Sequence, residues 1–464
     1  MRMLSYPFSQ DDLIELWLSW YNGTVKNYHE VGMYKDMDYD KYTSTTKQKH
    51  YPVGKMIASK MQELLFNEPV KVKFLNEATQ ARFDQVRQKS NMDDVFAMAC
   101  KMQSALGDTV LKINLDPMED APTISYYTPD LYEINEFKWG KVRDITFYTY
   151  QTSSKKKDYY VKEQHRLVRA LNIDNVRTIQ WEICQSLIEK DKMNGNIQEV
   201  SVETLEETAE LTPVIYSDKK MFWHLPINKP NTLTVSEKGI SDYHDSIDTF
   251  IEIDQALTSL FNDIIQGQAK MYVTADMLDV EYDDDGKPKY NYKINKNFHI
   301  LMEELDDPIQ VQFLIRFEEH LSGIEKLVMM AITQCKLSPT SFGYDSAGLK
   351  TATEVKSLQG ASFSTKLNRQ LSWKPALTEL FEMFIEWDNV KNKTAYDSTV
   401  DSIEFQDSLE NDVETTRKSV IEAVTGRIMS VWTGIKTLHP DWTDEAVIEE
   451  MQRINGIDDM EMME

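Results

Sequence analysis

The chain has 464 residues, of which 51 are Lys or Arg and 76 are Asp or Glu, so its formal net charge is −25. A broad basic face for nucleic acid is excluded by this balance, because neutralising phosphates requires Lys and Arg. With 41% hydrophobic and 11% aromatic residues the chain is not disordered, and its three scattered cysteines argue against a disulfide framework or a zinc module.

Apolar runs in the sequence are short. Stretches such as 95–100 and 327–332 reach six residues, far fewer than the roughly 20 needed to span a bilayer. The first residues contain no apolar signal core. We therefore expect a soluble chain, assembled inside a cell, without a membrane partner.

The first hundred residues are predicted to be mainly helical. Ser9 can cap one helix, a second is expected over 53–66, and a third begins after Asn91 and ends at Gly107. From there to about residue 235 the pattern alternates as in strands, with turn signals at 116–117, 139–140 and 194–195. This part of the chain indicates an antiparallel sheet.

The strongest single element is an amphipathic helix predicted over 240–268, with Ser241 as its N-cap. Apolar residues fill one half of this helix, and no Lys or Arg occurs between residues 240 and 268. Five acids fall within an arc on the opposite side: Asp242, Asp245, Asp248, Glu252 and Asp263. Asp254 instead projects on the apolar side, where a buried carboxylate needs a partner. Arg316 is the predicted ion-pair partner, with Lys326 as the alternative.

A small β insert is expected after this helix. Residues 280–294 form a predicted hairpin that turns at Asp285-Gly286, a favoured dipeptide for this kind of turn. An EF-hand is a poorer interpretation, because the twelfth loop position would be Tyr292 and not an acid. A second amphipathic helix is predicted over 309–336, so the two helices would flank the insert at their tip.

The rest of the chain is predicted to be helical after one polar loop. The loop covers 337–350, and Thr351 to Glu354 has the pattern of a capping box that starts a long helix. That helix should bend or restart near Pro375 and end around Val390. The tail after Asp397 is expected to be helical and acidic.

Motifs for catalysis are missing from the sequence. It contains no G-x-x-x-x-G-K-[ST], no H-E-x-x-H and no G-x-S-x-G, so we expect no enzyme activity, no cofactor and no metal. His244 and Asp248 are spaced as a possible metal or proton-transfer pair, but an incidental His on an acidic face is the better interpretation.

The order of these parts resembles a known protein family. The resemblance spans about residues 50–460 and is carried by 225–231, 236–241, 253–254, 342–355, 405–408, 426–430 and 444–445. The chain is similar to the portal, or head-to-tail connector, protein of long-tailed bacteriophages of Gram-positive hosts. No single motif carries this resemblance; the ordered set does.

The resemblance implies an α+β portal fold that assembles as a ring of twelve copies at one capsid vertex of the virion. Double-stranded DNA would be packaged and later ejected through its central channel. The implied partners are the terminase, the head-tail adaptor, and the major capsid and scaffolding proteins, with assembly in the host cytoplasm. By position, the implied parts are an N-terminal arm 1–50, wing 51–239, stem helices 240–268 and 309–336, clip 269–308, tunnel loop 337–351, long wing helix 352–396 and crown 397–464.

Two sets of residues would then meet the DNA. The five acids would line the channel as a negative wall along which a polyanion slides without sticking. The tunnel loop would project Ser338, Thr340, Phe342, Tyr344, Asp345 and Lys350, with weak attraction from Lys336 and Lys350. The open alternative is that the two helices pack within one monomer and the acids face solvent. Two other classes also stay open: another structural head protein, such as a capsid or scaffold component, and a DNA-processing enzyme.

Overall fold

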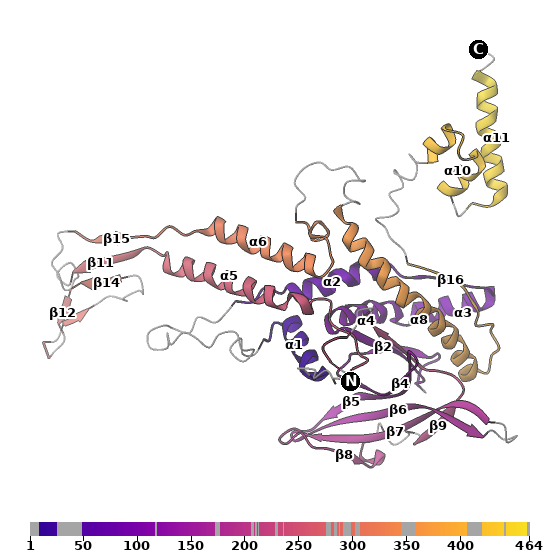
Figure 1. Ribbon diagram of the computed structural model, residues 1–464, viewed down its shortest axis with the longest axis horizontal. Helices are drawn as coiled ribbons and strands as arrows, with labels where there is room; N and C mark the ends of the chain where they lie inside the picture. The colour runs from indigo at the N-terminus through magenta and orange to yellow at the C-terminus, as the bar shows by residue number, and fades with distance from the viewer. Residues whose placement is uncertain are drawn as a thin grey trace, which may run out of the picture.

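The computed structural model combines a mixed body with two helices that project from it (Figure 1). The body contains the elements from α1 to β10 together with α8 and β16. We call α5 and α6 the projecting pair, and the small strands β11–β15 at their far end the tip. The structure describes residues 9–25, 49–116, 118–171, 177–205, 208, 211, 213–227, 231–234, 236–274, 280–282, 285–286, 288–290, 298–301, 307–344, 358–405, 420–439 and 442–461.

The helices at the start of the body confirm the sequence prediction. Helix α1 (Gln10–Asn22) is capped by Ser9, whose side chain accepts a hydrogen bond from the backbone N–H of Asp12. Helices α2 (Val53–Phe66) and α4 (Met92–Leu106) have the expected bounds, and α4 ends at Gly107 with φ of 84°. Strand β1 (Lys71–Phe74) and helix α3 (Glu77–Lys89) were not predicted. Helix α3 is mostly polar and buries few residues, so its periodicity is weak.

The sheets of the body are antiparallel, as expected. One has the order β10-β2-β3 and the other β4-β5-β6-β7-β8, with β9 also pairing with β7. Trp139 and Gly140 turn the chain with positive φ, and Gly195 does so between β7 and β8. The strands are β2 (Asp108–Asn114), β3 (Thr123–Tyr127), β4 (Tyr132–Lys138), β5 (Lys141–Ser153), β6 (Lys157–Leu171), β7 (Arg177–Asp191), β8 (Ile197–Val200), β9 (Val214–Ser217) and β10 (Phe222–Pro226).

Helix α8 (Gly360–Asn392) crosses the core of the body. Trp373, Leu377 and Phe381 on its inner side are fully buried. The predicted restart at Pro375 does not occur, and the helix continues through it. Pro375 lies on the exposed side of α8, where water can satisfy the carbonyl group that loses its N–H partner.

The projecting pair runs away from the body side by side (Figure 1). Both helices are shorter than predicted: α5 is Ile247–Gln266, after a 3₁₀ turn η3 (His244–Ser246), and α6 is Phe317–Gln334. Ser241 is buried and donates to the Ser104 carbonyl, so it is not the N-cap of α5. Residues 309–311 are not helical, because β15 (Ile309–Val311) pairs with β11 (Lys270–Thr274).

The tip and the tail complete the chain. In the tip, β11 also pairs with β14 (Phe298–Leu301), and β12 (Val280–Tyr282) pairs with β13 (Pro288–Tyr290) around Gly286, which confirms the predicted hairpin. In the tail, α10 (Val431–Leu438) and α11 (Asp444–Glu461) are helical as expected. Strand β16 (Val400–Glu404) pairs with β1, however, so the tail begins within the body and not as a separate helical unit at residue 397. The predicted capping box at 351–354 lies outside the described residues.

Candidate functional site

Three of the five predicted acids form an exposed stripe at the start of α5. Asp248 and Glu252 are exposed four residues apart on one side of α5, and Asp245 is exposed in the turn η3 just before the helix. We call these three residues the acidic stripe. The side chains of Asp248 and Glu252 reach solvent at the end of the projecting pair that is next to the body.

Asp242 does not belong to this stripe. It precedes α5, and its carboxylate accepts two hydrogen bonds from Arg369 of α8, at 2.8 and 2.7 Å, and one from Ser104 Oγ at 2.6 Å. Both members of this ion pair are largely buried. Asp242 therefore ties the root of the projecting pair to the body, and the prediction that it belongs to an open acidic face is wrong for this chain.

Asp263 lies on the side of α5 that faces α6. His320 Nε2 and Arg316 Nη2 each lie 2.9 Å from its Oδ2 atom. The hydrogen bonds from His320 and Arg316 hold the pKa of Asp263 below its ordinary value. Because Asp263 is paired across the two helices, its negative charge is partly compensated and it differs from the acidic stripe.

The predicted ion pair between Asp254 and Arg316 is wrong. The fully buried carboxylate of Asp254 lies 2.9 Å from His50 Nδ1 and accepts a hydrogen bond from the Tyr51 N–H at 2.8 Å. Arg316 is exposed and pairs with Asp263, nine residues or about 13 Å further along α5. The need for a partner was correctly inferred, but the chain segment before α2 supplies it.

The described half of the predicted tunnel loop is anchored to the body. Ser338 is buried, and its N–H donates to Ser362 Oγ at 2.8 Å. Thr340 and Phe342 are half-buried in the short helix η5 (Pro339–Phe342), and the Tyr344 hydroxyl lies 3.5 Å from that of Tyr51. Asp345 and Lys350 lie outside the described residues. Ser338 is thus an anchor of this segment to α8 and not a projecting group.

Large apolar side chains are exposed on the half of the projecting pair that lies next to the tip. They come from both helices and from the residues before α6: Phe261, Ile265, Phe313, Leu314, Phe317 and Leu321. Monomeric soluble proteins rarely expose so many neighbouring apolar groups, and such surfaces usually mark a protein contact.

A model of one protein family matches residues 10–463, almost the whole chain, and its description is phage portal protein, SPP1 Gp6-like. The chain belongs to this family of phage portal proteins. No curated protein matches the chain.

The root of the projecting pair in this portal protein is a buried polar junction that sequence reasoning missed. Gln103 Oε1 accepts hydrogen bonds from Arg369 and from Trp373 Nε1, at 3.1 and 2.9 Å, while its Nε2 donates to the Leu225 carbonyl. The junction joins α4, β10, α8 and the segment that leads into α5. A signal existed: Arg369 lies four residues before Trp373, so both are on the same face of the long helix.

A second buried charge cluster lies between the sheets of the body. Lys112 Nζ is 2.7 Å and His165 Nε2 is 2.5 Å from Glu163 Oε1. Burial raises the pKa of Glu163, but Lys112 and His165 outweigh this and hold it well below its ordinary value. These charges compensate one another inside the fold, which indicates a structural role.

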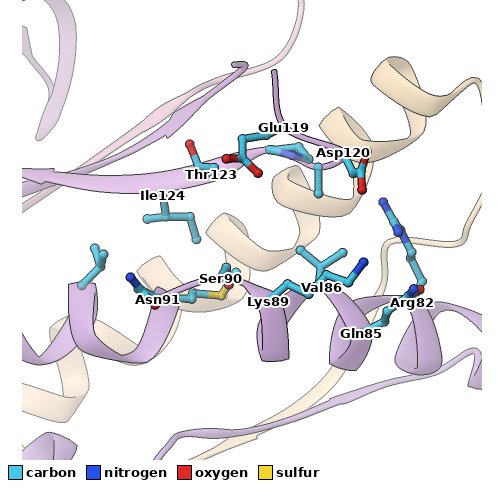
Figure 2. Close-up of a pocket in the computed structure, with 14 residues that line it drawn as sticks. Arg82, Gln85, Val86, Lys89, Ser90, Asn91, Glu119, Asp120, Thr123 and Ile124 are labelled. Carbon is cyan, nitrogen blue, oxygen red and sulfur yellow. The ribbon is translucent and has the colours of Figure 1, made fainter. Parts of the chain in front are cut away.

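One cavity with a defined lining lies in the body, away from the acidic stripe. Figure 2 shows this space of about 400 Å³ between α3, the start of α4 and the β2–β3 connection. Arg82 at its edge is held by two hydrogen bonds to Asp388, at 2.9 and 2.8 Å. None of the residues predicted for the channel or the tunnel loop lines it.

Metal and membrane sites can be addressed for the described parts of the chain. Within those parts, no three His, Cys, Asp or Glu side chains are placed to hold a metal ion together. Along the same stretches, no helix combines the length and the apolar character needed to cross a membrane.

Proposed function

We propose that twelve copies of this portal protein form a ring at one capsid vertex and conduct double-stranded DNA during packaging and ejection. In this assembly the projecting pair is the stem, the tip is the clip, the body is the wing, and the tail helices α10 and α11 belong to the crown. Residues 337–351 form the tunnel loop. The terminase and later the head-tail adaptor bind at the clip, and the major capsid and scaffolding proteins bind the outer parts. Copies assemble in the host cytoplasm.

The acidic stripe is the observation that carries this proposal. Asp248 and Glu252 are exposed on the projecting helix α5, and Asp245 is exposed in the turn η3 before it, so a ring would repeat all three around its axis. DNA carries one negative charge per about 1.7 Å of its axis, so a basic wall would retain it and an acidic wall lets it slide. Asp242 and Asp263 contribute less to this wall, since each is paired within the chain.

A mass measurement of the purified protein tests the ring. We expect about 650 kDa, twelve times the 54.0 kDa chain. A particle that remains at the mass of one chain at every concentration and salt condition would contradict the proposal.

Charge reversal of the stripe tests the conduit. In heads assembled with Asp248→Lys and Glu252→Lys, we expect slower DNA packaging, because the added cations bind phosphates. Raising the salt concentration should restore part of the rate by screening this attraction. The matched control reverses two exposed acids of α3, Glu77→Lys and Asp84→Lys, and should package normally. Equal rates for both variants at every salt concentration would contradict the conduit.

A further inference from the structure

Helix α6 carries an apolar stripe that changes environment along its length. Ile324, Val328 and Ile332 are buried, on a helix that packs mainly against α5 and also touches α2 of the body. Towards the tip the same stripe continues as Leu321 and Phe317, which are 49% and 48% exposed. Leu314, just before the helix, is 91% exposed. The stripe therefore extends beyond the part of α6 that the described chain buries.

Helix α5 has its own uncovered apolar residues at the same level. Phe261 and Ile265 are 39% and 54% exposed. They flank Asp263, which contacts Arg316 just before α6 and His320 within it. This contact places residues 261–265 of α5 beside residues 316–320 of the antiparallel α6 chain segment, so the two sets lie at one height, meaning one position along the length of the pair.

The two apolar surfaces point in different directions. At about 100° per residue, Phe261 and Ile265 each lie roughly 160° around α5 from Asp263, on the side turned away from α6. Phe317 and Leu321 lie about 60° and 100° around α6 from His320. One chain therefore cannot bury its α5 surface with its α6 surface, although both occur at one height.

We infer that, in the proposed ring, the α6 surface of one copy (Phe317 and Leu321) packs on the α5 surface (Phe261 and Ile265) of the next. A cyclic ring of more than two copies needs two different, complementary patches on each subunit, because its interfaces are heterologous. Rotation about the ring axis leaves each patch at its height, so patches at one level can meet. The occupant of each surface is thus a second copy of this chain.

This arrangement keeps the acidic stripe free for the channel. Asp248 and Glu252 are exposed and lie about 100–180° around α5 from Phe261 and Ile265. The subunit contact and the DNA-facing acids therefore use separate faces of one helix. Lys49 Nζ, 5.0 Å from the centre of the Phe261 ring, shields one side of that ring, so Ile265 is the more open of the two.

Cysteine cross-linking of the full-length assembly tests this inference. The variant Ile265→Cys with Phe317→Cys should give, after mild oxidation, a ladder of linked chains that extends to the closed ring. Asp248→Cys with Phe317→Cys is the matched control and should give at least several-fold less ladder. The unsubstituted chain sets the background, since Cys100 and Cys335 are buried and Cys184 is half-buried.

The outcomes separate this inference from the ring on which it rests, because the mass is measured before oxidation. A ring of full mass without a ladder, or with only intrachain disulfides, overturns the inference and leaves the ring intact. A chain that stays at 54.0 kDa overturns both. As a second test, Phe317→Ser with Leu321→Ser should shift the mass towards single chains while leaving the folding of the chain unchanged, and a ring as stable as the unsubstituted one would contradict the contact.

Discussion

The two halves of the projecting pair carry the same helical pattern in different surroundings. Next to the body, Ile324, Val328 and Ile332 of α6 are buried, whereas Phe317 and Leu321 next to the tip are about half exposed. Burying one large apolar side chain contributes about 1.5–3 kcal/mol. The body-proximal half thus gains its stability within one chain, whereas no described part of the chain covers Phe317 and Leu321 fully, and a second copy can do so in the proposed ring.

The largest expected effect is at the root of the pair. Arg369→Ala leaves the buried Asp242 carboxylate without its ion-pair partner, which typically costs about 3–5 kcal/mol. Urea unfolding of the variant should show this loss. The matched change at the other end, Arg316→Ala, removes a 64% exposed guanidinium from Asp263 and should cost far less. Equal losses of unfolding free energy for Arg369→Ala and Arg316→Ala would contradict the difference in burial between the two halves of the projecting pair.

A second pair of variants compares apolar positions on one stripe. Ile332→Ala should lower the free energy of unfolding by about 2–5 kcal/mol, because it opens a cavity in the body. Leu321→Ala should change it by less than about 0.5 kcal/mol in the isolated chain but weaken the assembly. Unfolding curves and the mass of the assembly measure the two effects. Leu321→Ala as destabilising as Ile332→Ala in isolated chains would show that both halves are buried within one chain.

Midway along α5, Asp254 should show an intermediate effect. Asp254→Ala removes the acceptor for His50 and for the Tyr51 N–H, and an unsatisfied buried donor costs about 1–3 kcal/mol. Thermal unfolding should show a lowered midpoint. Glu252→Ala, two residues earlier and exposed, is the control and should leave the midpoint nearly unchanged. No shift for Asp254→Ala would mean that residues 50–51 add nothing to the stability of the helix.

The smallest expected effect is a loss of folding stability at low pH through Asp263. The pKa of Asp263 in the folded chain is below its ordinary value of 3.8, so its contacts stabilise the fold above that pH. The stabilisation by these contacts should be lost as the pH falls below about 3.8 and then through the lower pKa of Asp263 in the folded chain. In Asp263→Asn this part of the pH dependence should be absent, which unfolding curves between pH 5 and 2 can measure. Identical pH profiles for the two proteins would contradict the pairing.

Local patterns predicted many elements of the fold. The Ser9 cap, the Gly107 terminator and the Gly286 turn each depend on a few neighbouring residues, and all three are confirmed. The polar and apolar order of residues 240–246 fits a helix and so predicts one there. In the structure Ser241 and Asp242 bond to α4 and α8 instead, and such distant partners cannot be read from local periodicity.

The candidate site was predicted in part for the same reason. Asp248 and Glu252 share one side of α5 as their spacing indicates, since helical geometry alone decides it, and both are exposed there. The partner of Asp254 was wrong, because His50 lies 204 positions away and only the tertiary fold brings it to α5. Likewise β16 pairs with β1, which lies more than 300 residues earlier in the chain. The local sequence of the tail therefore contains no pattern that predicts this pairing.

Electron cryomicroscopy of the purified assembly tests the account most directly. We expect a closed ring with an open centre, with the Asp248 and Glu252 side chains facing that opening and the α6 helix of each copy against the α5 helix of the next. Single chains, or a ring in which these two acids face outwards to bulk solvent, would contradict the account.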